Sequence, residues 1–105
     1  MENVVQANLL AATASQEGAW NRAYNVACGS RTTLNVLATL IRNEVGENKP
    51  EALKIEPRYE EFRKGDIRHS LADISQVKEL LGYFPVFSLQ DGLKKASTWY
   101  LRSTV

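Results

Sequence analysis

The residue types best suited to chemistry gather in one short stretch, residues 62–70. This stretch holds two arginines, a carboxylate, the only histidine of the chain and a serine around a single glycine. Gly65 permits a tight turn or a close approach of the backbone to a ligand. Arg63 can offer a planar fork of donors to a phosphate, and Asp66 can accept a hydrogen bond from a sugar hydroxyl. The stretch could hold a nucleotide sugar by its diphosphate and ribose, or it could be a solvated turn with a salt bridge.

Composition sets limits on what surrounds this stretch. The 105 residues are 44% hydrophobic and 24% charged, which is typical of one globular domain or of part of a larger one. Thirteen basic and twelve acidic side chains leave a net charge of +1, so we expect neither nucleic acid nor a membrane as a partner. The start of the chain lacks a signal-peptide pattern, and a lone Cys28, read as a small core residue, fits the cytoplasm.

Periodicity and turn residues predict the elements that position the stretch. Helices are expected over residues 2–15, 34–46, 73–81 and 88–101, from apolar residues that recur at three and four positions. Thr32 or Thr33 can cap the second helix and Gly46 can end it, while the third begins with capping-box spacing and stops at Gly82. Short strands are expected at residues 23–28, at 54–62 and around Ile67. The predicted fold is therefore α/β, with about four helices and two to four short strands in a mixed sheet.

Two of these helices carry specific expectations about burial. Val4, Val5, Leu9 and Ala12 share one face of the first helix, which has almost no charge and is expected to need cover on more than one side. The last helix is expected to bury one face, formed by Leu89, Leu93, Ala96 and either Trp99 or Tyr100.

Five ordered motifs resemble a known family. They are Glu2-Asn-Val-Val-Gln-Ala-Asn8, Tyr24-Asn-Val-Ala-Cys-Gly29, Arg63-Lys-Gly-Asp66, Leu71-Ala-Asp-Ile74, and Leu81-Gly-Tyr-Phe-Pro85 followed by Ser88-Leu-Gln-Asp-Gly-Leu93 and Trp99-Tyr100. Together they resemble the carboxy-terminal part of extended short-chain dehydrogenases, in the NAD-dependent epimerase/dehydratase group. The nearest resemblance is to bacterial UDP-N-acetylglucosamine 4-epimerases of polysaccharide biosynthesis, and it covers nearly all of residues 2–101. It implies a Rossmann-type parent of which residues 1–105 form a single partial, substrate-binding domain.

The resemblance implies roles for three residues. Arg63 would bind the UDP diphosphate and Asp66 a ribose hydroxyl, while Lys64 stands where relatives often carry proline, which predicts a less rigid turn. Ser70 lies where glucose- and galactose-restricted relatives carry tyrosine, so a small side chain there would leave room for an N-acetyl group. The alternative for Ser70 is an ordinary strand serine. Arg68 and His69 are interpreted as scaffold.

The chemistry of this family needs residues that the chain lacks. Hydride transfer to NAD requires a glycine-rich phosphate turn and a Tyr-x-x-x-Lys pair. No two of the six glycines lie closer together than ten residues, and no tyrosine is followed four positions later by lysine. We therefore expect no catalytic residue, no cofactor site and no metal site, and no activity from the isolated chain.

The expected picture is the last third of an epimerase, cut by construction or encoded as a truncated reading frame. UDP-N-acetylhexosamine would bind weakly if at all, and the uncovered first helix invites self-association. A stand-alone oligomeric binding module descended from the enzyme, and a fragment of a related nucleotide-sugar dehydratase, are the alternatives.

Overall fold

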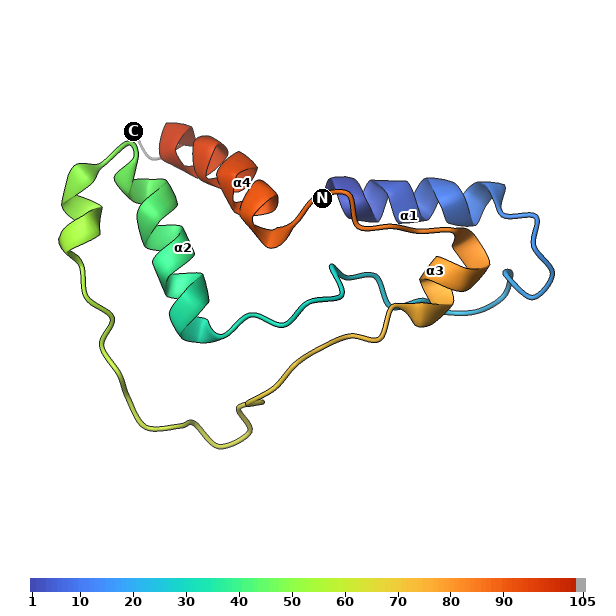
Figure 1. The fold of residues 1–105 in the computed structure, drawn as a ribbon, viewed down its shortest axis with the longest axis horizontal. Helices are drawn as coiled ribbons and strands as arrows, with labels where there is room; N and C mark the ends of the chain where they lie inside the picture. Colours follow the sequence, from blue (N-terminus) through green and yellow to red (C-terminus); the bar gives the residue numbers. More distant parts are fainter. Residues whose placement is uncertain (104–105) are drawn as a thin grey trace. The chain divides into compact units, whose positions relative to one another are not determined.

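The computed structural model describes residues 1–103. Its helices are α1 (Glu2–Thr13), α2 (Leu34–Gly46), the 3-10 helix η1 (Pro50–Lys54), α3 (Ser75–Leu81) and α4 (Leu89–Ser103) (Figure 1). The four predicted α-helices are confirmed, with ends shifted by one or two residues. Within the described residues, no helix is long and apolar enough to cross a membrane.

The chain divides into two compact units. The first combines Met1–Ser30 with Leu71–Leu89, and the second combines Arg31–Ser70 with the chain from Gln90 onward. The first unit contains α1 and α3, and the second contains α2, η1 and nearly all of α4. This division does not test the prediction of a single partial domain, which stays a prediction.

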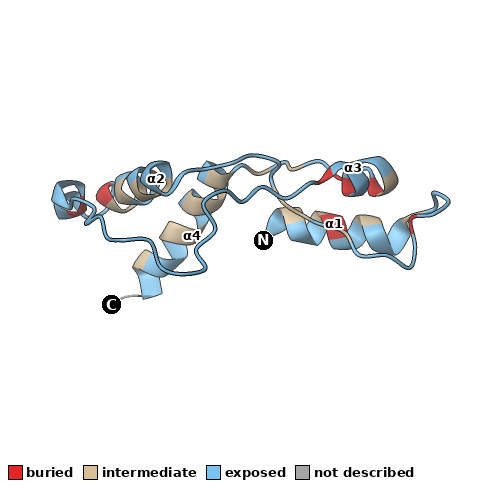
Figure 2. Ribbon diagram, turned by 90° about the horizontal axis from the view of Figure 1, so that it is seen from below, coloured by how far each residue is buried: buried red, intermediate tan, exposed pale blue. Residues whose placement is uncertain are grey.

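The first unit holds the main apolar core of the described chain. Val77 and Leu81 of α3 pack with buried residues from other segments of the unit, namely Ala7, Ala19, Ile74 and Tyr83. Figure 2 shows buried residues on α1 and α3. The packed side of α3 thus carries apolar residues four positions apart, which is the spacing of one helical face.

The side of α1 that packs is not the side with the largest apolar residues. Ala7 is buried and Leu10 is half-buried, whereas Val4, Val5 and Leu9 are exposed. Two side-chain amides of α1 also bind the segment after α3. The predicted helix is confirmed, and the face formed by its larger aliphatic side chains lies in solvent.

Two amides of α1 hold the segment after α3. Asn3 donates from Nδ2 to the Phe87 carbonyl at 2.7 Å and accepts from the Phe87 N–H at 3.1 Å. Gln6 accepts from the Phe84 N–H at 3.1 Å. Asn3 thus pairs both backbone groups of the half-buried Phe87, and Gln6 pairs the N–H of the exposed Phe84.

The two ends of α3 show different degrees of agreement with the prediction. The expected capping box is wrong in detail, because the helix begins at Ser75 and Asp73 instead accepts from the Ser75 N–H at 2.9 Å. Such short-range contacts of aspartate compete with helical capping. Gly82 ends the helix as predicted, in a left-handed conformation with φ +69° and with its N–H donating to the Lys78 carbonyl.

The predicted two to four strands are wrong: no strand is present among residues 1–103. A strand exists only as part of a hydrogen-bonded ladder, and neither residues 23–28 nor residues 55–62 have a ladder partner in the described chain. Cys28, predicted to be a core residue, is exposed at the end of the first of these segments, with Sγ 3.6 Å from the Phe87 carbonyl oxygen.

The second unit is built around α2 and η1, which pack against each other. Thr33 caps α2 as predicted, because its side-chain oxygen accepts from the Val36 N–H at 3.2 Å. Gly46 is buried at the last position of α2, and Ala52 is buried in η1. The predicted buried face of α4 is confirmed only in part: Leu89, Leu93 and Ala96 are half-buried, whereas the Trp99 and Tyr100 side chains are exposed. No residue of α4 is fully buried (Figure 2).

Candidate functional site

Arg63 and Asp66 lie in one closed turn of the second unit. The Asp66 N–H donates to the Arg63 carbonyl at 3.1 Å, and the Arg63 N–H donates to Asp66 Oδ2 at 3.1 Å. Gly65 occupies the third position with φ +94°, where several β-turn types require a positive φ and therefore favour glycine. Lys64 occupies the second position, where proline is common in such turns.

The charged groups of this turn face solvent. The Arg63 side chain is 90% exposed, and its Nε lies 3.9 Å from Asp66 Oδ2, so the ion pair is loose. Surface pairs of this kind contribute about 0–1 kcal/mol. Among the described residues, no partner is found for Asp66 Oδ1, so the turn presents a guanidinium and a carboxylate oxygen to an outside ligand.

Two neighbours of the turn make contacts that the sequence did not indicate. The Arg68 guanidinium carbon lies 4.5 Å from the centre of the Phe62 ring. His69 Nδ1 lies 3.5 Å from Arg31 Nη1. Ser70, the third predicted site residue, is exposed four positions beyond Asp66. The turn thus brings Arg63 and Asp66 together, while Ser70 lies outside its hydrogen-bonded ring.

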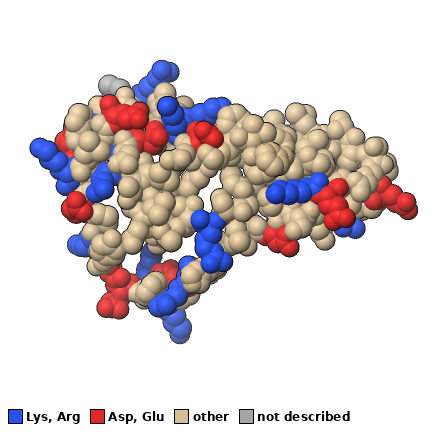
Figure 3. Space-filling model, in the orientation of Figure 1, with Lys and Arg blue, Asp and Glu red and all other residues tan. Residues whose placement is uncertain are grey.

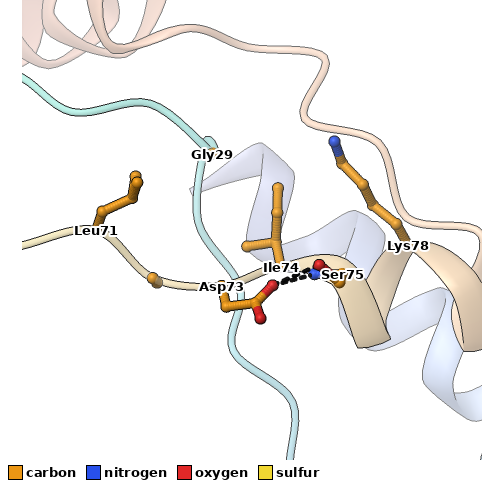
Figure 4. Close-up of a pocket in the computed structure, with 7 residues that line it drawn as sticks. Gly29, Leu71, Asp73, Ile74, Ser75 and Lys78 are labelled. Carbon is orange, nitrogen blue, oxygen red and sulfur yellow. Dashed lines mark hydrogen bonds between the residues drawn. The ribbon is translucent and has the colours of Figure 1, made fainter.

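A shallow depression of about 310 Å³ lies in the first unit. It is lined by Gly29, Leu71, Ala72, Asp73, Ile74, Ser75 and Lys78 (Figure 4). The Asp73 carboxylate is already bound by Ser75, as the dashed lines in Figure 4 show, and these bonds lower the pKa of Asp73, the hydroxyl bond more than the backbone bond. Lys78 extends over the Phe84 ring at 5.8 Å. The remaining lining is mostly apolar, so this depression offers little to a charged nucleotide.

Metal binding has no candidate among the described residues. No three side chains of histidine, cysteine, aspartate or glutamate lie together as a metal ion would need. The segment that contains the turn carries charged side chains of both signs (Figure 3, with the segment drawn yellow to gold in Figure 1). With an exposed guanidinium and a carboxylate side by side, the turn is a candidate for binding an anionic, hydroxyl-bearing ligand.

Comparison with curated proteins finds nucleotide-sugar 4-epimerases. The chain is 28% identical over 93 residues to a dTDP-L-rhamnose 4-epimerase of Burkholderia thailandensis, covering 89% of this chain and 24% of that protein. It is 30% identical over 67 residues to a UDP-glucuronate 4-epimerase of Thermodesulfobacterium geofontis, covering 64% and 19%. It is 32% identical over 77 residues to a UDP-glucose 4-epimerase of Mycolicibacterium smegmatis, covering 73% and 23%. No protein-family model matches the chain.

The matches support an NAD-dependent epimerase family of the short-chain dehydrogenase type. This agrees with the resemblance of the sequence motifs, and it implies a Rossmann-type parent for a chain whose described part is helical. The chain spans less than a quarter of the length of these three relatives. The names of these relatives differ in both nucleotide and sugar. They therefore support the epimerase family, but they do not support UDP-N-acetylglucosamine as the specific substrate.

Proposed function

We propose that this chain is the nucleotide-sugar-binding segment of a 4-epimerase, with a UDP-N-acetylhexosamine as its ligand. The observation that carries the proposal is the closed turn, in which Asp66 Oδ2 binds the Arg63 N–H while the Arg63 guanidinium stays exposed. Guanidinium forks match phosphate oxygens with two parallel hydrogen bonds, and a carboxylate accepts from hydroxyls. Arg63 is proposed to bind the diphosphate and Asp66 a ribose hydroxyl.

Ser70 is proposed to leave space for the acetamido group of the sugar. A serine side chain is much smaller than an aromatic ring, and at this position it would not fill the volume that an N-acetyl group needs. The exposed position of Ser70, four residues after Asp66, is compatible with this role. The proposal of an N-acetylated sugar depends on Ser70 alone.

The isolated chain is proposed to bind without catalysing. Its 105 residues contain neither a glycine-rich dinucleotide turn nor a Tyr-x-x-x-Lys pair, and the hydride chemistry of this family needs both. NAD is therefore proposed to be held by residues other than these. A surface with one guanidinium and one carboxylate forms part of a cleft, and two or three charge-assisted hydrogen bonds must offset an association cost of about 4–15 kcal/mol. We expect millimolar or weaker affinity, about −4 kcal/mol at best.

An amide-resolved NMR titration with UDP-N-acetylglucosamine tests the proposal. Wild-type amides of residues 63–70 should shift, and the response should be lost in Arg63→Gln. Lys64→Gln is the matched control, because it removes a neighbouring exposed cation without touching the hydrogen bonds of the turn. Equal loss of the amide shifts in both variants would show that the response depends on general positive charge and not on Arg63 in particular. The absence of shifts in the wild type would overturn the proposal.

Parallel titrations identify the ligand class. UDP-glucose, dTDP-L-rhamnose and free UDP separate the sugar from the nucleotide, and NAD is added in a separate experiment. A stronger response to UDP-N-acetylglucosamine than to UDP-glucose, reversed by Ser70→Tyr, is the expected result. A response to NAD would contradict the proposal that the cofactor is held elsewhere.

A second candidate function, an oligomeric interaction module, is favoured by one observation. The exposed face of α1 carries Val4, Val5 and Leu9, and Leu9 is 63% exposed. In Figure 3 the surface over α1 shows almost no charged atoms. We propose a second copy of the chain as the partner of this face, because two uncharged helices do not repel each other. A 12-residue helix face falls well short of the roughly 800 Å² per partner in stable interfaces, so the association should be weak.

A further inference from the structure

The turn that contains Arg63 and Asp66 has little support from the rest of the protein. Residues 55–74 contain no helix or strand, and every residue from 53 to 73 is exposed. A segment with few buried apolar contacts opens at a low free-energy cost, and a long-range side-chain contact near the turn is that of His69 Nδ1 with Arg31 Nη1 at 3.5 Å. The question is which local interactions close this turn, because an open turn would separate the two groups that we propose to bind the nucleotide sugar.

A pair of residues outside the turn lies across its base. Phe62 directly precedes Arg63, and Arg68 follows Asp66 by two positions. The Arg68 guanidinium carbon lies 4.5 Å from the centre of the Phe62 ring, well within the roughly 6 Å over which a cation is attracted to an aromatic face. This contact joins the two chain segments that enter and leave the turn.

We propose that Phe62 and Arg68 are positioning residues that staple the turn shut and hold the Arg63 guanidinium and the Asp66 carboxylate side by side. The inference rests on the proposed nucleotide-sugar function of this same site. The staple acts with the two hydrogen bonds between Arg63 and Asp66, each at 3.1 Å. The Arg68 guanidinium contacts the Phe62 ring, whereas the side chain of Arg63 remains 90% exposed.

The expected effect follows from the strength of exposed cation–π pairs. Loss of such a pair should lower the ratio of closed to open turn by about two- to five-fold. The affinity for a ligand that binds only the closed turn should fall by the same factor wherever the open form becomes dominant, since apparent affinity scales with the competent fraction. The overall stability of the chain should not change, because Phe62 and Arg68 lie in an exposed segment.

The test uses the full chain and compares four variants by NMR. Phe62→Leu removes the aromatic face but keeps an apolar side chain, Phe62→Tyr retains the face, and Arg68→Gln removes the cation. Tyr59→Leu is the matched control, because Tyr59 is an exposed aromatic side chain three positions before Phe62. Three readouts are recorded: the ring-current shift of the Arg68 side-chain protons, the exchange rates of the Arg63 and Asp66 amides without ligand, and the titration with UDP-N-acetylglucosamine.

The staple predicts one pattern of results. Phe62→Leu and Arg68→Gln should speed exchange of the two amides by about two- to five-fold and lower the affinity for UDP-N-acetylglucosamine by up to the same factor. Phe62→Tyr should keep the amide exchange rates and the response to the ligand at their wild-type values, and Tyr59→Leu should change neither quantity. Unchanged amide exchange in Phe62→Leu and Arg68→Gln would overturn the staple whether or not the ligand binds. A wild type that ignores UDP-N-acetylglucosamine would overturn the proposed function instead, while faster exchange in Phe62→Leu would still support the staple.

Discussion

At the scale of single residues, two tyrosine hydroxyls connect residues 23–28, which lack a strand partner among the described residues, to neighbouring parts of the first unit. Tyr83 is 2% exposed and donates to the Ala27 carbonyl at 2.8 Å. Tyr24 donates to the Ala19 carbonyl at 2.5 Å. Burial raises the pKa of the Tyr83 hydroxyl, and the Cys28 thiol adds a smaller electrostatic contribution. The proton of Tyr83 is therefore retained, and the residue acts as a donor that fixes residues 23–28 to the core.

Tyr83→Phe tests this role. The variant removes the donor and leaves the Ala27 carbonyl without it, so the free energy of unfolding should fall by about 1–3 kcal/mol. Tyr59→Phe is the control, because Tyr59 is exposed and its change should stay within about 0.5 kcal/mol. Urea unfolding of the two variants and the wild type measures the difference. Equal stability of Tyr83→Phe and Tyr59→Phe would show that the Tyr83 hydroxyl does not hold the segment.

At the scale of elements, the close approach of η1 to α2 explains why position 46 is a glycine. The sequence pattern alone indicated only that this glycine ends the helix. Gly46 is the last residue of α2, and α2 continues into the cap at Glu47 without a left-handed residue. A Cβ at Gly46 would lie 2.6 Å from Leu53 Cγ in η1, a separation that real Cβ atoms essentially never show. The glycine lets η1 pack on α2, and η1 leads into the chain that continues to the Arg63–Asp66 turn.

A comparison of the stabilities of Gly46→Ala and Gly92→Ala tests the contribution of this packing contact. Gly92 lies inside α4 with nothing within 4 Å of an added Cβ, so alanine there should raise the free energy of unfolding by about 0.5–1 kcal/mol. Gly46→Ala gains the same helix preference but overpacks against Leu53, which costs about 1–3 kcal/mol. Denaturant unfolding should therefore rank Gly92→Ala above the wild type and Gly46→Ala at or below it. Equal stabilisation by both would mean that Leu53 moves aside without cost.

At the scale of the whole molecule, apolar side chains lie in solvent on both units. Exposed large apolar residues include Val4, Val5 and Leu9 on α1, Leu34 and Ile41 on α2, and Trp99 and Tyr100 on α4. Contiguous exposed apolar surface marks interaction sites or a tendency to associate. On α1 this surface coincides with near absence of charge, which favours self-association over a charged partner.

Leu9→Glu tests association through α1. Two added carboxylates across a symmetric contact should abolish any concentration-dependent association, which analytical ultracentrifugation measures from micromolar to millimolar chain. Leu34→Glu introduces the same change at another exposed leucine, outside α1, and should leave the association intact. If both variants associate like the wild type, α1 is not the contact.

Several features of the fold and the candidate site were predictable because they depend on neighbouring residues alone. The α-helices, the Thr33 cap and the Gly82 stop follow from periodicity and capping chemistry within a few positions. The turn that joins Arg63 to Asp66 follows from the glycine between them. The Phe62–Arg68 contact was not predictable, because spacing in an irregular segment does not say which side chains meet.

The remaining features were decided by contacts between residues far apart in the chain. Which face of α1 packs depended on the Phe84 and Phe87 amides, which meet Gln6 and Asn3 across about eighty residues. The expected strands failed because a ladder needs a second segment alongside, and within the described residues no such segment is present. Sequence by itself determined the local elements and the residues of the turn. Tertiary structure alone decided burial, pairing and exposure, because these arise only when distant segments meet.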